Sequence, residues 1–382
     1  MNTKASYTAS PEEVRRHLHT IPELSACEKE TSGYIADQLR NAGIKVIYQN
    51  FSFHSILAVI SGKNEGPSIL FRCELDALPI LESNDIEYKS KYPGVSHKCG
   101  HDGHAANMIS FAHKLRENPF ERGTILLFFQ SAEETGAGAK AALDTGIFEQ
   151  FNIEYVFAYH NIPGYRLGDI LAKEGLFTPC VESMEVALTG KTSHAAEPKN
   201  GINPAVTSAQ IVMYLDSINQ PEKNSQDYFI STPIHLFMGE KAYGTSASKS
   251  SIGYTFRAWN NAFFEKQKCH ITEKIMALAT DNLLQCTITW LEAFKANHND
   301  TSAVNYIQSA AKECNYPFVS LENAFEFGED FGAFTQKYKG AMFGIGSGED
   351  HSLLHSEEYD FPDELIEVGS NMFYKIVRQI LG

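Results

Sequence analysis

The sequence lacks the features of a membrane, secreted or nucleic-acid-binding protein. It has no run of about eighteen uninterrupted apolar residues, so no transmembrane helix is predicted. The first residues contain no apolar stretch of the kind that a secretory signal needs. Lys and Arg number 32 against 47 Asp and Glu, and the formal net charge of -15 does not suit a surface that neutralises phosphates. We therefore expect a cytoplasmic protein with neither nucleic acid nor membrane as a partner.

Paired cysteines and internal repeats are also lacking. The chain has 7 cysteines, an odd number without a pairing rhythm, so no disulfide framework is predicted. Most of them are expected to be reduced and buried, and only Cys99 stands among other types of metal ligand. The remaining composition, 43% hydrophobic and 21% charged, is typical of a globular protein, and 382 residues favour two domains.

Apolar runs alternate with helical patterns and predict an α/β fold. Ser10, Pro11 and Glu13 have the spacing of a capping box at a first helix, and a second helix is expected over 29–41. Buried strands are predicted over 56–60, 69–75, 125–129, 155–159 and 342–346. This order favours a central, mostly parallel mixed sheet flanked by helices.

The texture of the sequence changes near Thr178. Residues 181–188 alternate between apolar and polar, which indicates a half-exposed strand of a separate, smaller sheet. Further elements are expected in this part as helices over 204–219 and 262–279 and strands over 228–237, 251–258 and 286–292. We therefore predict a larger domain in two parts, 1–179 and 293–382, interrupted by an α+β domain over 180–292.

The strongest chemical signal is the run from Cys99 to His104, Cys-Gly-His-Asp-Gly-His, with the pair Glu133-Glu134 further along the chain. Thiol, imidazole and carboxylate are ligands that suit zinc, manganese or a similar divalent ion. A plainer interpretation makes Asp102 the cap of a helix that begins at His104 and leaves His101 as a loop residue.

The position of other acids and imidazoles favours the metal interpretation. Glu74 and Asp76, Glu133 with Glu134, and His160 all fall at the carboxyl ends of predicted strands. In open α/β sheets, that edge is where ligands bind. Three strands would thus deliver ligand-type side chains to one edge of the sheet.

These donors suffice for two divalent metal ions. A Cys99 thiolate has lone pairs to bridge both ions, and a neighbouring cation would lower the pKa of the thiol. The remaining metal ligands would be His101, Glu134, His160 and His355. Glu133 would act as general base toward a metal-activated water, and Asp76 would orient a ligand imidazole. A rival interpretation makes Cys99 a nucleophile with His101 as its base.

Motifs along nearly the whole chain extend this pattern. They are Arg15-Arg16-His17-Leu18-His19, Pro22-Glu23-Leu24, Asp76-Ala77-Leu78-Pro79, the Cys99 run, Gln130-Ser131-Ala132-Glu133-Glu134, Tyr159-His160-Asn161, Gly190-Lys191-Thr192-Ser193-His194-Ala195-Ala196, Glu329-Asp330-Phe331 and Leu354-His355-Ser356. In this order they resemble the two-metal amidohydrolase and aminoacylase peptidase family, which includes N-acyl-amino-acid amidohydrolases, hippurate hydrolases and auxin-conjugate hydrolases.

The resemblance implies roles for individual residues. The implied ligands of two manganese or zinc ions are Cys99, His101, Glu134, His160 and His355. Glu133 is the implied base, and the insert is implied to be a lid or dimerisation domain through which a homodimer forms. From this domain, His194 would bind the substrate carboxylate or stabilise the oxyanion, and Arg257 would clamp a carboxylate.

The resemblance also implies the reaction, namely metal-dependent hydrolysis of the amide bond of N-acyl amino acids or related small conjugates. A dipeptidase or metallocarboxypeptidase of the same fold is the first alternative. A cysteine-nucleophile hydrolase and a noncatalytic binding protein are the others. The sequence departs from the family at Glu74, where Asp is usual, and over 244–251, which lacks a common Asn-x-Ile-Pro motif. His351, close to His355, competes for the same ligand role.

Overall fold

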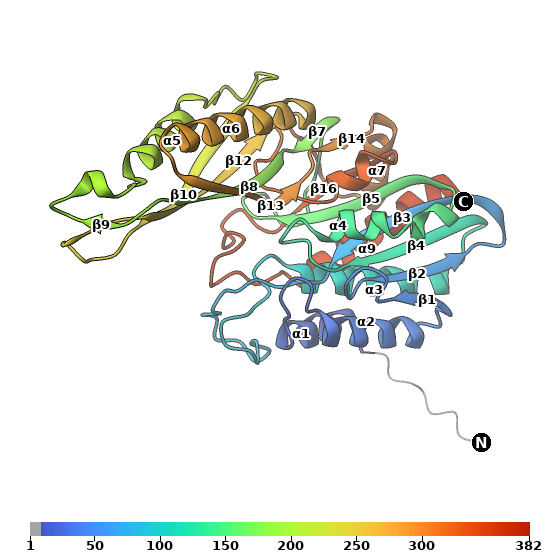
Figure 1. Ribbon diagram of the computed structural model, residues 1–382. Helices are drawn as coiled ribbons and strands as arrows, with labels where there is room; N and C mark the ends of the chain where they lie inside the picture. The colour runs from blue at the N-terminus through green and yellow to red at the C-terminus, as the bar shows by residue number, and fades with distance from the viewer. Residues whose placement is uncertain (1–8) are drawn as a thin grey trace. The chain divides into compact units, whose positions relative to one another are not determined.

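The computed structural model describes residues 9–382 and divides the chain into two compact units. Unit 1 runs to Phe177 and continues with 297–324 and 329–382. Unit 2 contains 178–296 together with 325–328. Each unit is built around its own main sheet (Figure 1). The predicted insert, 180–292, falls within unit 2, and its role as a lid or dimerisation domain stays a prediction.

Unit 1 contains a mixed sheet of eight strands. In spatial order they are β1 (Val46–Gln49), β2 (Ile56–Ser61), β4 (Arg122–Gln130), β3 (Asn64–Glu74), β5 (Ile153–Ile162), β16 (Gly340–Gly346), β6 (Ile170–Ala172) and β15 (Phe318–Ser320). The central strands β4, β3, β5 and β16 run parallel to one another. The expected mixed, mostly parallel sheet with flanking helices is confirmed.

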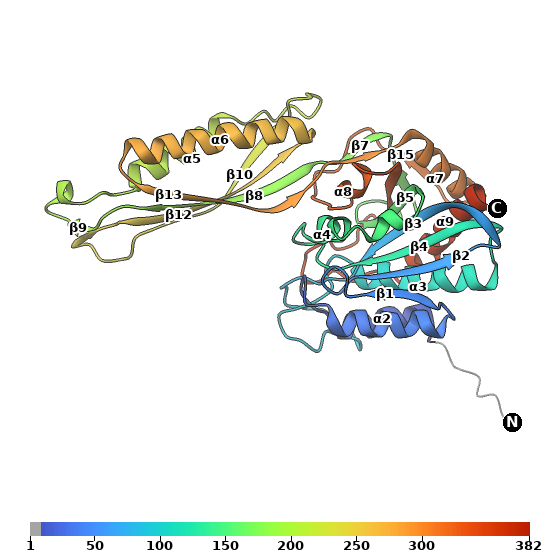
Figure 2. The same ribbon diagram turned by 45° about the vertical axis from the view of Figure 1, so that its right-hand side comes forward.

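Helices cover both faces of this sheet, as Figures 1 and 2 show. The helices of unit 1 are α1 (Pro11–Thr20), α2 (Lys29–Asn41), α3 (His101–Glu117), α4 (Gly138–Asp144), the 3-10 turn η1 (Ile147–Gln150), α7 (Thr301–Cys314), α8 (Gly332–Thr335) and α9 (Glu364–Leu381). The capping box predicted for α1 is present, and α2 has the predicted bounds. A short pair, β7 (Gly175–Thr178) and β14 (Asn297–Asn299), lies where the chain passes between the units.

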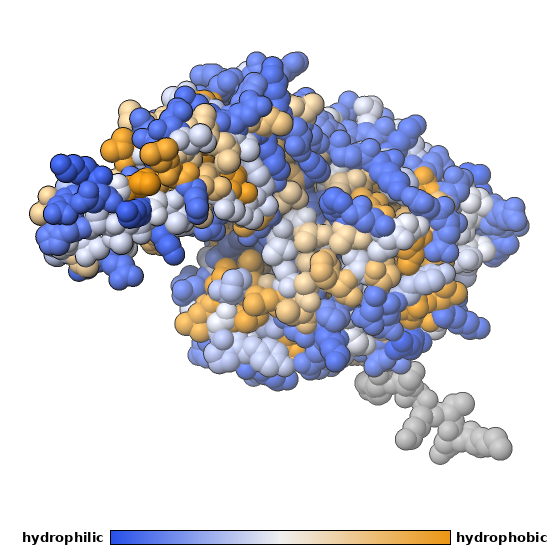
Figure 3. Space-filling model, in the orientation of Figure 1, coloured by the Kyte–Doolittle hydropathy of each residue, from blue (hydrophilic) through white to orange (hydrophobic). Residues whose placement is uncertain are grey.

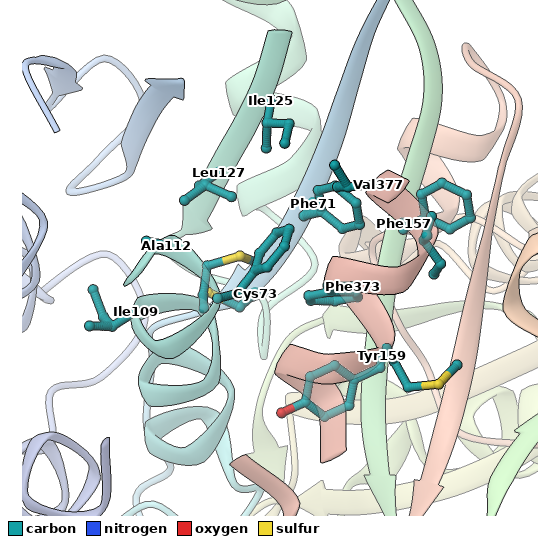
Figure 4. Packing of buried hydrophobic residues seen from close by; sticks show 14 of the residues in the cluster. Phe71, Cys73, Ile109, Ala112, Ile125, Leu127, Phe157, Tyr159, Phe373 and Val377 are labelled. Atoms are coloured by element: carbon teal, nitrogen blue, oxygen red, sulfur yellow. The ribbon is translucent and has the colours of Figure 1, made fainter. Parts of the chain in front are cut away.

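The core of unit 1 forms where α3 and α9 pack against the sheet. Phe71 of β3 contacts Phe111 of α3, with ring centroids 4.9 Å apart. Its ring also lies 4.8 Å from that of Phe373 of α9 (Figure 4). On the opposite face of β4, the ring of Phe128 lies 5.2 Å from that of Phe148. Because successive residues of a strand face opposite ways, a continuous apolar run is needed to bury both faces.

The amino end of α3 is fixed by two glycines. The helix begins at His101 with Gly100 as its N-cap at φ 95°, so the alternative in which Asp102 caps a helix from His104 is wrong. A Cβ on Gly103 would lie 2.3 Å from the Phe361 ring, which only glycine avoids. The carboxylate of Asp102 instead pairs with Arg15 and His19 inside the unit.

Unit 2 is an antiparallel sheet covered by two helices. Its strands, in spatial order, are β10 (Phe229–Met238), β12 (Lys249–Ala258), β8 (Cys180–Thr189) and β13 (Gln285–Phe294), and its helices are α5 (Ala205–Ser217) and α6 (Asn261–Asp281). A small pair, β9 (Ser193–His194) and β11 (Thr245–Ser246), and the turn η2 (Pro198–Asn200) complete it. Along β8, buried Met184 and Val186 alternate with exposed Glu185 and Ala187, as the period of a strand requires.

No helix within residues 9–382 is both long enough and apolar enough to cross a bilayer.

Candidate metal centre and active site

The carboxyl ends of three parallel strands supply much of the site. Glu74 is the last residue of β3, Glu133 and Glu134 follow β4, and His160 lies near the end of β5. Since β3 pairs in parallel with both β4 and β5, these ends meet at one edge of the sheet. The first turn of α3 brings His101 to the same edge.

Cys99 belongs to two neighbouring groups of potential ligands. The ligand atoms of Cys99, His101 and His160 lie within 4.8 Å of one another, and so do those of Cys99, Glu134 and His355. Cys99 Sγ is 3.4 Å from Nε2 of His160. His355 Nε2 is 3.7 Å from Glu134 Oε2. Two sites that share one sulfur atom are therefore available in the geometry of the chain.

His101 and His160 are each oriented by a hydrogen bond of Nδ1, the ring nitrogen that does not face the other candidate ligands. His101 Nδ1 is 2.9 Å from the carbonyl oxygen of Asp76, whose carboxylate Oδ1 is 3.4 Å away. His160 Nδ1 is 2.9 Å from the carbonyl oxygen of Asn161. When each imidazole is neutral, its Nδ1 donates to the carbonyl and its Nε2 keeps a lone pair for the site. Burial opposes the charged form of His101, but Asp76 and the carboxylates of Glu74 and Glu134 raise its pKa to about 10, so a cation would have to displace the proton from Nε2. Asp76 also accepts the backbone N–H of Glu134 at 2.9 Å, so it fixes two of the candidate ligands.

The electrostatics of this cluster fit a cation. Nε2 of His101 and Oε1 of Glu134 are buried without a hydrogen-bond partner among the described residues. Burial, together with the carboxylates of Glu134 and Glu133, raises the pKa of the Cys99 thiol well above its usual value. Burial likewise raises the pKa of Glu134 to about 7. Nearby divalent ions would reverse these shifts, and sulfur, nitrogen and oxygen donors are those that zinc and manganese accept.

Glu133 lies beside these ligands but points to a different neighbourhood. Its Oε2 is 3.9 Å from His101 Nε2, and it also groups with the carboxylates of Glu329 and Asp330. Burial and these two acids raise the pKa of Glu133 well above its usual value, and Arg72 opposes the rise. A carboxylate that gains a proton readily is suited to general acid-base work.

Arg72, the buried cation behind Glu133, has no role among those predicted from the sequence. Its Nη2 lies 2.9 Å from Glu329 Oε1 and 2.6 Å from Asp330 Oδ1, and its Nη1 pairs with Glu74. The charged residue inside a continuous apolar strand was the available signal, because such a residue needs buried partners.

Glu74, whose role the sequence analysis left open, links this cation to α3. Its Oε2 lies 2.6 Å from Nδ1 of His104, and His104 Nε2 lies 2.5 Å from Oδ1 of Asn161. Burial alone would raise the pKa of Glu74, but Arg72 and His104 hold it well below its usual value. The acid is therefore ionised, and it joins β3, α3 and β5 behind the candidate ligands.

His351 and His355 are separated by the fold. His355 has a positive φ of 63°, its N–H donates to the carbonyl of Lys98, and its ring joins the group of Cys99 and Glu134. The ring of His351 lies 5.1 Å from that of Tyr359 and belongs to none of these groups.

The two predicted substrate-binding residues belong to unit 2. His194 is exposed on β9, and its Nδ1 accepts the backbone N–H of Ala196 at 3.1 Å. Arg257 lies on β12, where its Nε donates to the carbonyl oxygen of Glu326 at 3.1 Å. Their contribution to the site stays a prediction.

Comparison with known proteins gives concordant results. The model of the family described as peptidase family M20/M25/M40 matches residues 70–379. The chain is 30% identical to an N-acetyl-L-cysteine deacetylase of Bacillus subtilis, with 96% of this chain and 87% of the relative covered. It is 28% identical to a hippurate hydrolase of Campylobacter jejuni, with 97% and 96% covered. Its fold resembles the crystal structure of the YxeP protein of Bacillus subtilis, a dinuclear metal binding peptidase, with a TM-score of 0.80, 26% identity and 97% of each chain covered.

Proposed function

Because the chain belongs to peptidase family M20/M25/M40, we propose that it is a metal-dependent amidohydrolase that cleaves N-acyl amino acids or related small conjugates. Two relatives support this substrate class, because their names describe action on an acylated amino acid. One is an N-acetyl-L-cysteine deacetylase and the other is a hippurate hydrolase. The observation that carries the proposal is the pair of ligand groups that share Cys99, with Glu133 beside them.

Five residues would hold two divalent cations, with manganese or zinc as the proposed metals. They are Cys99, His101, Glu134, His160 and His355. The dinuclear relative of known structure supports the number of ions. Bound there, two cations would polarise the amide carbonyl and lower the pKa of a water molecule. Asp76 orients His101 through its backbone oxygen and holds the Glu134 backbone, so it is the proposed positioning acid.

Glu133 is the proposed general base. Its buried carboxylate would accept a proton from the attacking water and deliver that proton to the nitrogen of the leaving amine. The raised pKa lets the same group hold the proton between the two transfers.

His194 and Arg257 are the proposed contacts to substrate from unit 2. The N–H of Ala196 donates to His194 Nδ1, so the neutral imidazole carries its proton on Nε2. That nitrogen would donate to a substrate carboxylate or to the developing oxyanion. Arg257 donates to Glu326 from Nε, and its two Nη atoms would donate to a substrate carboxylate.

The cysteine-nucleophile alternative receives little support from the geometry. Cys99 is buried, and the raised pKa of its thiol disfavours the thiolate in the absence of a cation. The imidazole within reach of Sγ is that of His160 and not that of His101, which the alternative required.

The test is a substrate panel with the purified protein loaded with manganese or zinc. We expect N-acetyl and N-benzoyl amino acids to be hydrolysed faster than unblocked dipeptides. A preference for dipeptides would favour the dipeptidase alternative, and a C-terminal release from longer peptides would favour a carboxypeptidase. If the loaded protein bound these compounds without hydrolysing any, a noncatalytic binding role would replace this proposal.

We also propose a homodimer formed through unit 2. Strand β10 is the edge of its sheet, and its side chains Leu236 and Phe237 are 51% and 68% exposed. Val206 and Met213, one heptad apart on α5, are 65% and 72% exposed. Figure 3 shows apolar side chains gathered at the end of unit 2 where α5 and α6 overlap in that view. An apolar edge strand is a ready surface for antiparallel pairing with its own copy about a two-fold axis.

A cytoplasmic location is proposed as well. All 7 cysteines are free thiols, which suits a reducing compartment. Only Cys73, Cys99 and Cys180 are buried, so the expectation that most of them would be is wrong.

A further inference from the structure

The loop that carries Glu133 and Glu134 contains a strained residue. Ala132 immediately precedes Glu133, is 1% exposed and has a φ of 58°. An alanine in the left-handed region is disfavoured because its Cβ approaches the following carbonyl oxygen. A conformation of this kind persists only where the surrounding structure enforces it.

The carboxylate of Glu28 binds this strained segment directly. Glu28 Oε1 accepts the backbone N–H of Ala132 at 2.7 Å, and Oε2 accepts the hydroxyl of Ser131. The same Oε1 accepts the N–H of Ala26 at 3.0 Å, and Ala26 also has a positive φ, 64°. One fully buried carboxylate therefore holds two left-handed alanines from segments far apart in the chain.

Glu28 is free for this task because another residue caps its helix. It occupies the N-cap position of α2, yet its side chain makes no capping hydrogen bond there. The N–H groups of Glu30 and Thr31 are accepted by the carboxylate of Glu23 at 3.1 and 2.8 Å. Burial raises the pKa of Glu28 to about 6, with the nearby Asp76 adding to the rise, so at neutral pH the group is the ionised acceptor.

The rest of the loop closes around Ala132. Its carbonyl accepts the N–H of Gly138 at 2.9 Å, and a Cβ on Gly138 would lie 1.9 Å from the carbonyl oxygen of Ser131. The N–H of Ser131 donates to Ser55 Oγ at 3.1 Å. If Ala132 relaxed to the right-handed region, the chain direction after it would change and both following side chains would turn.

We propose that Glu28 is a positioning residue, which holds Ala132 in the left-handed conformation and thereby aims Glu133 and Glu134 into the site. This inference rests on the proposed function for its link to catalysis. The effect of Glu28 on the conformation of Ala132 does not depend on that function.

The experiment compares the three single variants E28A, E28Q and A132G with the double variant that combines E28A and A132G. The metal-free proteins are examined by hydrogen exchange of the segment 130–138, and the metal-loaded proteins by kcat and KM on an N-acyl amino acid. The control I35A removes a buried core side chain from the same helix α2 without touching the loop.

We expect E28A to accelerate exchange at Ala132 and to lower kcat by about 100-fold with little change in KM, since small misplacements of reacting groups have effects of this size. E28Q keeps an oxygen acceptor for both N–H groups, so it should stay close to the unsubstituted protein in both measurements. Glycine adopts the left-handed conformation without a penalty. In the A132G background, E28A should therefore lower kcat by a clearly smaller factor than it does in the unsubstituted protein.

Three results would overturn the inference. They are an effect of E28A no larger than that of I35A, an effect of E28A that is equal in the two backgrounds, and an E28Q variant as impaired as E28A. If the unsubstituted protein hydrolyses no N-acyl amino acid, the proposed function fails, and the exchange of Ala132 still decides the role of Glu28. If E28A does not fold, E28D takes its place in both backgrounds, because its side chain is one methylene too short to keep the carboxylate on the N–H of Ala132.

Discussion

At the scale of single residues, the candidate site contains more acids than its cations can balance. Arg72 faces Glu74, Glu329 and Asp330, and Glu133 is held next to the latter two. Burial raises the pKa of Asp330 to about 7, with Arg72 opposing. The mutual repulsion of these buried acids destabilises the site unless further positive charge balances it. Two divalent ions would supply that charge.

Replacing Glu133 separates the proton transfer from metal binding. We expect Glu133→Ala to keep both metal ions, because the proposed ligand is Glu134, and to lose at least about 10²–10⁴-fold in kcat, the contribution of a general base. The measurements are kcat and the metal content of the purified variant. A variant with unchanged turnover would exclude Glu133 as the base, and a variant without metal would indicate that Glu133 is itself a ligand.

The sequence marks the candidate ligands more clearly than it marks the residues behind them. Cys99, His101 and Glu134 can be recognised in the sequence because thiol, imidazole and carboxylate rarely occur together without a chemical reason. Glu28 gives no such signal, because its partner Ala132 is distant in the chain. Arg72 is marked only as a charge inside an apolar strand, which does not reveal its distant partner Asp330. Only the folded structure shows that these single side chains each hold several groups.

At the scale of elements, the segment between β3 and α3 is tied down by a buried acid. Glu82 is 4% exposed, and its Oε1 lies 2.9 Å from His19 Nε2 and 2.8 Å from Lys98 Nζ. Burial alone would raise the pKa of Glu82, but these hydrogen bonds lower it to about 2. Lys98 directly precedes Cys99, so the acid connects this segment to the run of candidate ligands.

The pH dependence of stability should report this contact. A carboxylate whose pKa is lowered by folding stabilises the protein fully above its unfolded pKa, about 4.3, and loses that contribution as the pH falls toward the folded value. We expect Glu82→Gln to lose about 1.5–3 kcal/mol at pH 7, as for a hydrogen bond to a charged group. Denaturant unfolding of the metal-free proteins between pH 7 and pH 3 measures this difference in the free energy of unfolding. A difference between variant and parent that did not shrink at low pH would contradict this assignment.

Secondary structure was predictable where the pattern is local. The box of Ser10 and Glu13 defines the start of α1, and the apolar run over 125–129 lies within β4. Helices α7 and α9 were not predicted, although the spacing of Leu365, Met372 and Ile376 in α9 follows the helical period. The left-handed Ala132 had no signal, because alanine favours the right-handed helix and tertiary contacts decide its conformation.

At the scale of the whole molecule, the family and fold expected from the motifs are confirmed. The motifs extend along most of the chain, so their order restricts the fold far more than a single motif does. The arrangement of the sheet was not predictable in detail, because strand pairings such as β16 with β5 join segments separated by all of unit 2.

Metal removal tests the central chemical claim. Exhaustive chelation should abolish hydrolysis, and added manganese or zinc should restore it, because the proposed ligands form two groups that share Cys99 and could each hold an ion. Activity and metal content are measured on the same samples. Hydrolysis that survived complete removal would instead favour Cys99 as the nucleophile.

The oligomeric state tests the proposed surface of unit 2. We expect the protein to sediment as a dimer and Leu236→Asp to shift it to the monomer, since a charge on the edge strand opposes pairing. Leu283→Asp is the matched control, because Leu283 is 77% exposed on the same unit but lies outside β10. A monomeric parent protein, or a dimer indifferent to Leu236→Asp, would contradict this interface.

The place of β16 in its sheet has a consequence for biosynthesis. This strand enters between β5 and β6, both of which precede unit 2 in the chain. A nascent polypeptide emerging from the ribosome therefore exposes two apolar strand edges until β16 has been translated. During that interval all the main strands of unit 2 have been translated, while the edges of β5 and β6 still lack their partner, and unpaired edges of this kind are prone to aggregation.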